Sequence, residues 1–114
     1  MSASDDLAAK HCGPCTAGTP PLAGEELERL LGQLRGWSAT GGSKRLEKEY
    51  RFPDFKSALA FVNRVGELAE QEGHHPDIEL GWGRVKLTLW THSIGGLSEN
   101  DFILAAKADQ ALAG

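Results

Sequence analysis

The sequence lacks both a long apolar run and an excess of basic residues. Without a run of roughly 20 apolar residues, we expect no membrane-spanning helix. The 12 Lys and Arg against 16 Asp and Glu give a formal net charge of −4, which disfavours direct binding to nucleic acid. The N-terminal segment also lacks the basic-then-apolar pattern of a signal peptide, so we expect a cytoplasmic protein. A chain of 114 residues is long enough for one domain with a single core.

Cysteine is also scarce. The two cysteines, Cys12 and Cys15, form a Cys-Gly-Pro-Cys sequence, the same four letters as the thioredoxin active site. A redox pair of that kind needs a helix after it, and residues 16–21 (TAGTPP) cannot begin one. A zinc site with His11 is conceivable, but two cysteines supply only half of the usual four ligands. We therefore expect residues 1–21 to be a flexible or loosely packed N-terminal arm without chemistry of its own.

Residues 22–114 are expected to form the domain, in the order helix, two strands, helix, two strands, helix. The predicted helices, marked by apolar residues at helical spacing, cover residues 25–36, 54–72 and 98–112. The predicted strands, marked by apolar–polar alternation, cover residues 37–40, 44–52, 78–82 and 85–92. Short turns inside each strand pair imply antiparallel hairpins. We expect an α+β domain with a four-stranded antiparallel sheet and helices packed on one face.

Three local signals refine this prediction. Gly73 is a natural stop for the long helix. The run Ser-Glu-Asn-Asp at residues 98–101 has the form of a capping box that opens the last helix, and this role alone accounts for Asp101. Lys48 is the one mismatch on the apolar face of its predicted strand.

Three of the four histidines, His74, His75 and His92, lie at the ends of predicted elements. Pro76 favours extended backbone at His75, so the adjacent pair occupies a sharp helix-to-strand junction. Imidazole titrates nearest to neutral pH, so such a group suggests proton transfer or metal binding. A lone surface histidine is usually only solvated, and adjacent histidines rarely both bind one metal ion. Acid–base chemistry is therefore the better interpretation, and we expect no metal.

The motifs His-His-Pro (74–76), Thr-His (91–92) and Gly-Leu-Ser-Glu-Asn-Asp (96–101) resemble the pattern of the pterin-4a-carbinolamine dehydratase family, over residues 36–106. The resemblance implies the same architecture and dehydration of a 4a-hydroxytetrahydrobiopterin-type carbinolamine to quinonoid dihydropterin. It implies no cofactor, and a role in pterin recycling for an aromatic amino-acid hydroxylase. It also implies a homo-oligomer, dimer or tetramer. Trp90, left uncovered if all helices pack on the other sheet face, favours an oligomer too.

By the same resemblance, His75 would be the base that takes the N5 proton. His74 and His92 would be acids that serve the leaving hydroxyl, one for each stereoisomer. Four further residues would lie beside the pterin or orient a histidine: Glu70, Trp90, Thr91 and Ser93. Glu70 could equally be a solvated helix residue, and Trp90 could equally be part of the sheet packing.

Two positions depart from the pattern of several relatives. Gly73 stands where they carry aspartate, and Ile78 where some are aromatic. Neither change touches the three histidines, so activity is still expected. Two other functions remain open: a non-catalytic interaction or assembly module of the same fold, and a metal or redox protein built on His11, Cys12 and Cys15.

Overall fold

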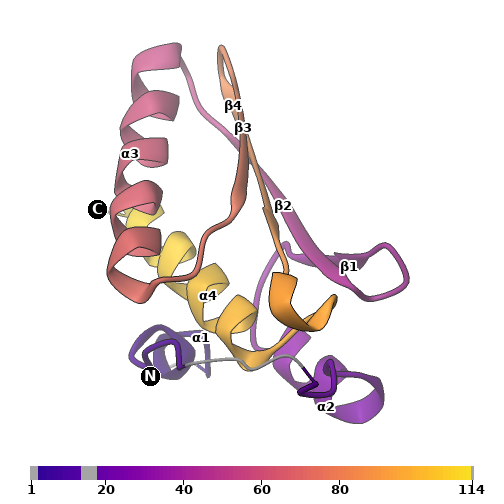
Figure 1. The fold of residues 1–114 in the computed structure, drawn as a ribbon. Coiled ribbons are helices and arrows are strands. Elements are labelled where there is room, and N and C mark those ends of the chain that lie inside the picture. The colour runs from indigo at the N-terminus through magenta and orange to yellow at the C-terminus, as the bar shows by residue number, and fades with distance from the viewer. Residues whose placement is uncertain (1–2, 14–17, 114) are drawn as a thin grey trace.

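The computed structural model describes residues 3–13 and 18–113. Within these residues the helices and strands are α1 (Ala3–Ala8), α2 (Gly24–Leu31), β1 (Ser38–Thr40), β2 (Arg45–Arg51), α3 (Phe55–Glu72), β3 (Asp77–Gly81), β4 (Arg84–Leu89), the 3-10 helix η1 (His92–Ile94) and α4 (Glu99–Ala113). The predicted α+β fold with a four-stranded antiparallel sheet is confirmed (Figure 1).

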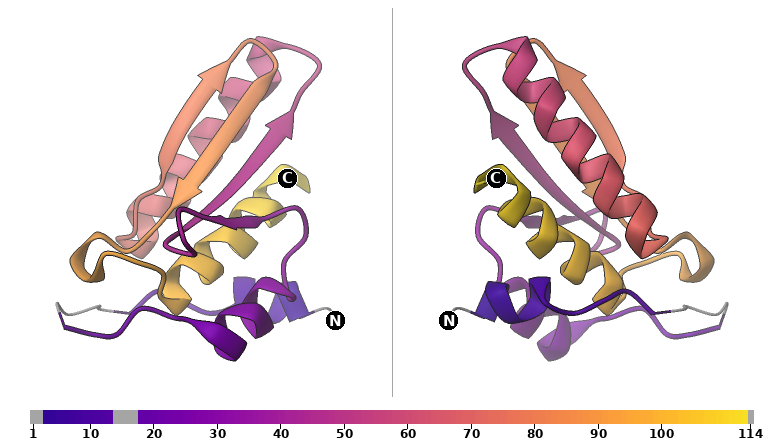
Figure 2. Two further views of the ribbon diagram at one scale, coloured as in Figure 1. Left: turned by 90° about the vertical axis from the view of Figure 1, so that its right-hand side faces the viewer. Right: turned by 90° about the vertical axis from the view of Figure 1, so that its left-hand side faces the viewer.

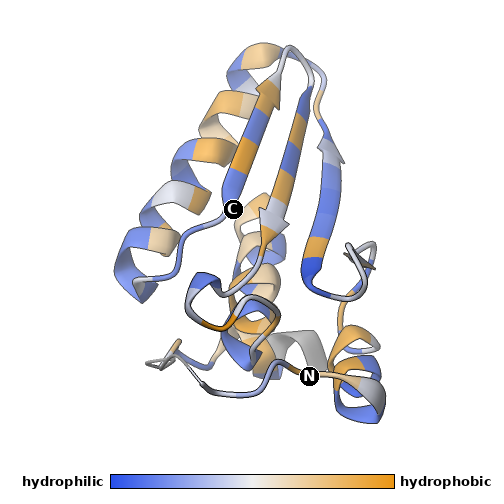
Figure 3. Ribbon diagram, turned by 45° about the vertical axis from the view of Figure 1, so that its right-hand side comes forward, coloured by the Kyte–Doolittle hydropathy of each residue, from blue (hydrophilic) through white to orange (hydrophobic). Residues whose placement is uncertain are grey.

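The sheet has the strand order β1-β2-β4-β3, and every neighbouring pair is antiparallel. Helices α3 and α4 lie on one side of it (Figure 2). The alternation of apolar and polar residues along the strands separates two faces, and it is visible in β3 and β4 (Figure 3). The inward side chains of the two central strands are buried: Leu46, Tyr50, Val85, Leu87 and Leu89.

Helix α4 is the centre of the packing. It contacts α1, α2 and α3, and its buried side chains lie on all sides of its first three turns: Phe102, Ile103, Leu104, Ala105, Ala106 and Ala108. A helix that is apolar nearly all round is typical of the middle of a core. Among the described residues, no helix is both long and apolar enough to cross a lipid bilayer.

The N-terminal segment differs from the prediction of a loose arm. Residues 3–8 form α1, which packs against α4, and Leu7 and Ala8 are buried. The Lys107 ammonium group donates a hydrogen bond to the Ala8 carbonyl oxygen at 2.7 Å, which satisfies a carbonyl at the end of α1. A six-residue helix is too short to show a periodic pattern, and its stability comes from tertiary contacts.

Two element boundaries also differ. Helix α2 ends at Leu31 instead of near Gly36, although turn-type hydrogen bonds carry the chain on to Leu34. Strand β4 ends at Leu89, so His92 does not end a strand but begins the 3-10 helix. Thr91 still makes an isolated antiparallel bridge to Gly96, which closes the loop between β4 and α4.

Lys48, the mismatched residue of β2, has a partner that the strand pattern could not reveal. Its ammonium group lies 2.8 Å from an Asp109 carboxylate oxygen and also donates to the Arg35 carbonyl oxygen at 2.9 Å. Asp109 accepts hydrogen bonds from the Tyr50 hydroxyl at 2.6 Å and the Trp37 indole at 3.1 Å as well. Burial, followed by the hydrogen bond to Asp109, raises the pKa of Tyr50 above its ordinary range.

Candidate active site

The two adjacent histidines diverge at the end of α3. Gly73 ends the helix in the left-handed conformation, at φ 65°, a value that glycine adopts without strain. The His74 backbone N–H still bonds to the Ala69 carbonyl oxygen at 3.2 Å. The His74 side chain is only 12% exposed, whereas that of His75 is 58% exposed and lies 3.3 Å from a Glu70 carboxylate oxygen.

His74 is held by a buried carboxylate. Its Nε2 lies 2.6 Å from Oδ1 of Asp101, whose side chain is fully buried. The other Asp101 oxygen accepts from the Thr91 hydroxyl at 2.8 Å and from the Ser98 N–H at 2.9 Å. An ionised carboxylate only accepts hydrogen bonds, so neutral His74 donates through Nε2–H. Because Nε2 is occupied, Nδ1 is the nitrogen through which His74 can exchange a proton with a ligand.

This network corrects the interpretation of Asp101. The predicted capping contact exists, since the Ser98 N–H donates to Asp101. The cap does not account for Asp101 alone, because the same carboxylate also binds His74 and Thr91. The Thr91 hydroxyl is 2.7 Å from the Ser98 hydroxyl as well, so its polar contacts lie within the protein.

His92 lies on the opposite side of the site, after β4. Its imidazole stacks on the Trp90 indole with ring centres 4.4 Å apart and an interplanar angle of 5°. The Arg45 guanidinium carbon lies 4.8 Å from the centre of the Trp90 ring. Trp90 is therefore half-buried by the imidazole and by Arg45, and it is not the uncovered side chain expected from the sheet pattern.

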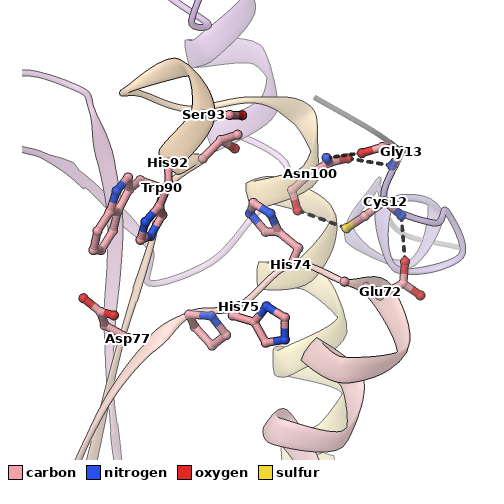
Figure 4. A pocket seen from close by; sticks show the side chains of 13 residues that line it. Cys12, Gly13, Glu72, His74, His75, Asp77, Trp90, His92, Ser93 and Asn100 are labelled. Atoms are coloured by element: carbon pink, nitrogen blue, oxygen red, sulfur yellow. Dashed lines mark hydrogen bonds between the residues drawn. The ribbon is translucent and has the colours of Figure 1, made fainter. Parts of the chain in front are cut away.

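A cavity of about 390 Å³ joins these groups (Figure 4). Six of the seven predicted site residues line it: His74, His75, Trp90, Thr91, His92 and Ser93. The seventh, Glu70, lies outside the lining, 80% exposed, and touches the site through His75. Two or three imidazoles around one cavity can remove one proton from a ligand and deliver another.

Part of the N-terminal segment also lines the cavity, which the sequence did not indicate. Cys12, Gly13 and Asn100 are among the lining residues, and so is Glu72. Glu72 had the pattern of an ordinary surface carboxylate, but its side chain is 7% exposed. The Cys12 N–H, 2.6 Å from Glu72, and then the nearby His11 lower the pKa of the Glu72 carboxyl.

Cys12 is not placed for redox chemistry. Burial, and next the charge of Glu72, raise the pKa of its thiol to about 12, so the thiol stays protonated at neutral pH. Cys15, the other half of the Cys-Gly-Pro-Cys sequence, lies outside the described residues. Within residues 3–13 and 18–113, no three His, Cys, Asp or Glu side chains are grouped so as to hold a metal ion.

The sequence profile of the family described as Pterin 4 alpha carbinolamine dehydratase matches residues 20–111. A relative from Rubrobacter xylanophilus is 56% identical over 105 residues, covering 92% of this chain and 97% of its own. One from Alkaliphilus metalliredigens is 51% identical over 106 residues, covering 93% and 96%. Both bear the name pterin-4-alpha-carbinolamine dehydratase provisionally.

Two solved structures share the fold. A protein from Brucella melitensis, described as a transcriptional coactivator/pterin dehydratase, superimposes with a TM-score of 0.77 at 32% identity, covering 81% of this chain and 98% of its own. A pterin dehydratase-like RuBisCO assembly factor of the alpha-carboxysome gives a TM-score of 0.62 at 27% identity, covering 70% and 93%. With a profile match over most of its length and relatives above 50% identity, the chain belongs to the pterin-4-alpha-carbinolamine dehydratase family.

Proposed function

We propose that the protein dehydrates a 4a-hydroxytetrahydrobiopterin-type carbinolamine to quinonoid dihydropterin. The observation that carries this proposal is the cavity on which His74, His75 and His92 converge, with a buried carboxylate behind one of them. We further propose that residues 22–114 are the dehydratase domain and that the reaction serves an aromatic amino-acid hydroxylase in the cytoplasm. No cofactor is needed, because the reaction is a proton-coupled loss of water.

The proposed reaction balances with proton transfers alone. The N5–H bond breaks and its proton goes to an imidazole. The C4a–O bond breaks as an imidazolium protonates the departing hydroxyl, which leaves as water, and a double bond forms between N5 and C4a. One imidazole has gained a proton and another has lost one, and exchange with solvent restores both. Each positioned group typically contributes about 10²- to 10⁴-fold in rate.

We assign the base to His75 and the two acids to His74 and His92. Glu70, 3.3 Å from His75 Nε2, would orient the base as a positioning residue. Asp101 would fix the orientation of the His74 ring, since the carboxylate is its direct partner. Trp90, Thr91 and Ser93 would lie along the pterin, where the Thr91 hydroxyl and backbone N–H are already bonded to Asp101 and to the Gly96 carbonyl oxygen.

A direct assay tests the activity. A hydroxylase reaction generates the 4a-carbinolamine, and its decay is followed by absorbance with and without this protein. We expect acceleration over the uncatalysed decay that survives prior treatment with a chelator. Acceleration that disappears with the chelator and returns with zinc or iron would contradict a metal-free mechanism. No acceleration at any protein concentration would contradict the dehydratase assignment.

A second function is favoured by one comparison. The structural relative from the alpha-carboxysome is described as a RuBisCO assembly factor, and it covers 70% of this chain. This chain could likewise act as a non-catalytic interaction or assembly module. The assay above separates the two, since an assembly module does not need three imidazoles around one cavity and would not accelerate the decay.

We also propose that the protein forms a homo-oligomer, a dimer or a tetramer. Support comes from large apolar side chains left exposed among the described residues: Phe55, Leu59 and Trp82. Contiguous apolar surface often marks an interface between proteins. Light scattering at micromolar concentration should give a multiple of 12.2 kDa. A mass of one chain under those conditions would refute this proposal.

A further inference from the structure

Three consecutive residues of the N-terminal segment, His11 to Gly13, are bound beside the cavity by hydrogen bonds. We call these three residues the strap. At its first attachment the Cys12 N–H donates to Glu72 Oε1 at 2.6 Å, and His11 Nδ1 lies 2.9 Å from Glu72 Oε2. Lys107 Nζ, 3.8 Å from Glu72, adds a cation to the same carboxylate. A carboxylate that is nearly buried requires such partners, so Glu72 forms a specific docking point for the strap.

The second attachment is a pair of hydrogen bonds with Asn100. The Gly13 N–H donates to Asn100 Oδ1 at 3.0 Å, and Asn100 Nδ2 donates to the Gly13 carbonyl oxygen at 2.7 Å. The Cys12 thiol points to the Asn100 carbonyl oxygen at 3.6 Å. Asn100 is buried and Gly13 is exposed, so these bonds are partly shielded from water, and the side-chain amide fixes the strap in one orientation.

The strap is attached to the same two chain segments that hold His74. Glu72 is two residues before His74, and Asn100 is next to Asp101, the partner of His74. The strap therefore lies beside the part of the cavity wall that carries this imidazole. Further along the chain, the Leu22 N–H donates to the Leu97 carbonyl oxygen at 2.8 Å. This bond attaches the chain that follows the strap to the residues just before α4.

The chemistry that the strap offers to a ligand is uncharged. The Cys12 N–H and the Gly13 N–H and carbonyl groups are bonded to Glu72 and Asn100, and the strap residues that line the cavity are Cys12 and Gly13. The thiol is neutral at physiological pH. Such a wall packs against an uncharged part of a ligand and excludes water from it.

We propose that the strap is one wall of the pterin-binding site and an affinity determinant for an uncharged part of the substrate, with Glu72 and Asn100 as its positioning residues. This inference rests on the proposed function. It assigns to the N-terminal segment a role in substrate binding and none in proton transfer. Loss of the strap should therefore raise KM and leave kcat nearly unchanged.

The test compares Asn100→Ala with the unaltered full chain. Fluorescence titration with L-biopterin should give a Kd raised by roughly tenfold, as for the loss of a pair of partly buried hydrogen bonds. KM for the carbinolamine should rise in parallel, with kcat within about twofold. In hydrogen exchange followed by NMR, the Cys12 and Gly13 amides should lose protection in the variant. In the unaltered protein, L-biopterin should increase their protection, because binding and docking are linked.

Further variants distinguish a failure of the strap inference from a failure of the proposed dehydratase function. Glu72→Gln is a second variant with the same expected pattern, should Asn100→Ala not fold. Glu67→Gln and Asn63→Ala, exposed positions on α3 away from the strap, should match the unaltered protein. If the unaltered protein binds L-biopterin and turns over, but strap variants keep its Kd and KM, the strap inference is overturned alone. If it neither binds nor turns over, the proposed function fails and the inference with it.

Discussion

Replacing His75 with alanine is expected to slow dehydration of both stereoisomers of the carbinolamine by about two to four decades. The hydroxyl can leave from either face of the ring, whereas the N5 proton lies near the ring plane and is the same for both isomers. A single base therefore serves both. Turnover of each isomer, prepared separately, measures the effect, with circular dichroism to check that the variant is folded.

The two proposed acids, His74 and His92, should differ in the stereoisomer that each one serves. His74 and His92 lie on different sides of the cavity, one at the end of α3 and the other after β4 (Figure 4). Each single alanine variant should therefore affect one stereoisomer more than the other. The double variant should lose about as much as His75→Ala, roughly two decades or more. Near-native turnover of both isomers by His75→Ala would show that the assigned base is wrong, even if the protein is a dehydratase.

Replacing Asp101 with alanine is expected to lower the free energy of unfolding by about 3 to 5 kcal/mol. The fully buried carboxylate accepts from His74, Thr91 and the Ser98 N–H, and its removal leaves three buried groups without their acceptor. Urea unfolding monitored by circular dichroism measures the loss. The neighbouring Glu99→Ala is the matched control, because the ion pair of Glu99 with Lys10 is exposed and its loss should change stability by less than about 1 kcal/mol.

Asp101→Asn separates the stabilising role from the chemical one. Its side-chain oxygen can still accept from Thr91 and Ser98, but its amide nitrogen would face His74 Nε2. An amide nitrogen only donates, so His74 would have to take the tautomer with the proton on Nδ1. We expect a smaller loss of stability than for alanine, together with slower turnover of the isomer that His74 serves. A stable variant with unchanged turnover of both isomers would contradict a role for Asp101 in catalysis.

Features that depend on nearby residues could be predicted from the sequence. Three such features are the apolar–polar alternation in β2 and β4, the glycine that ends α3 and the capping run before α4. Each depends on residues only a few positions apart in the sequence. The site could be predicted in outline because three histidines lie at element ends, and six of seven predicted residues do line one cavity. Their assigned chemical roles remain predictions.

Features that depend on distant residues could not be predicted. Lys48 interrupts the apolar face of β2, and the sequence does not explain why, because its partner Asp109 is 61 positions away. Glu72 resembled any helix-surface glutamate, since only the folded chain brings Cys12 onto it, across 60 positions. Asp101 was assigned to its local cap because its partner His74 is 27 positions earlier. In each case a polar group is satisfied across the fold, and a single sequence carries no periodic signal for such a pair.

The central position of α4 has a consequence for biosynthesis. The helix formed by residues 99–113 supplies a packing surface for α1, α2 and α3, so the packing of these earlier helices is incomplete until that segment exists. A nascent chain still lacking it would expose the apolar faces of α2, α3 and the sheet to solvent. We therefore expect folding to be completed only after this segment has left the ribosome, and the unfinished chain to be the form most prone to aggregation.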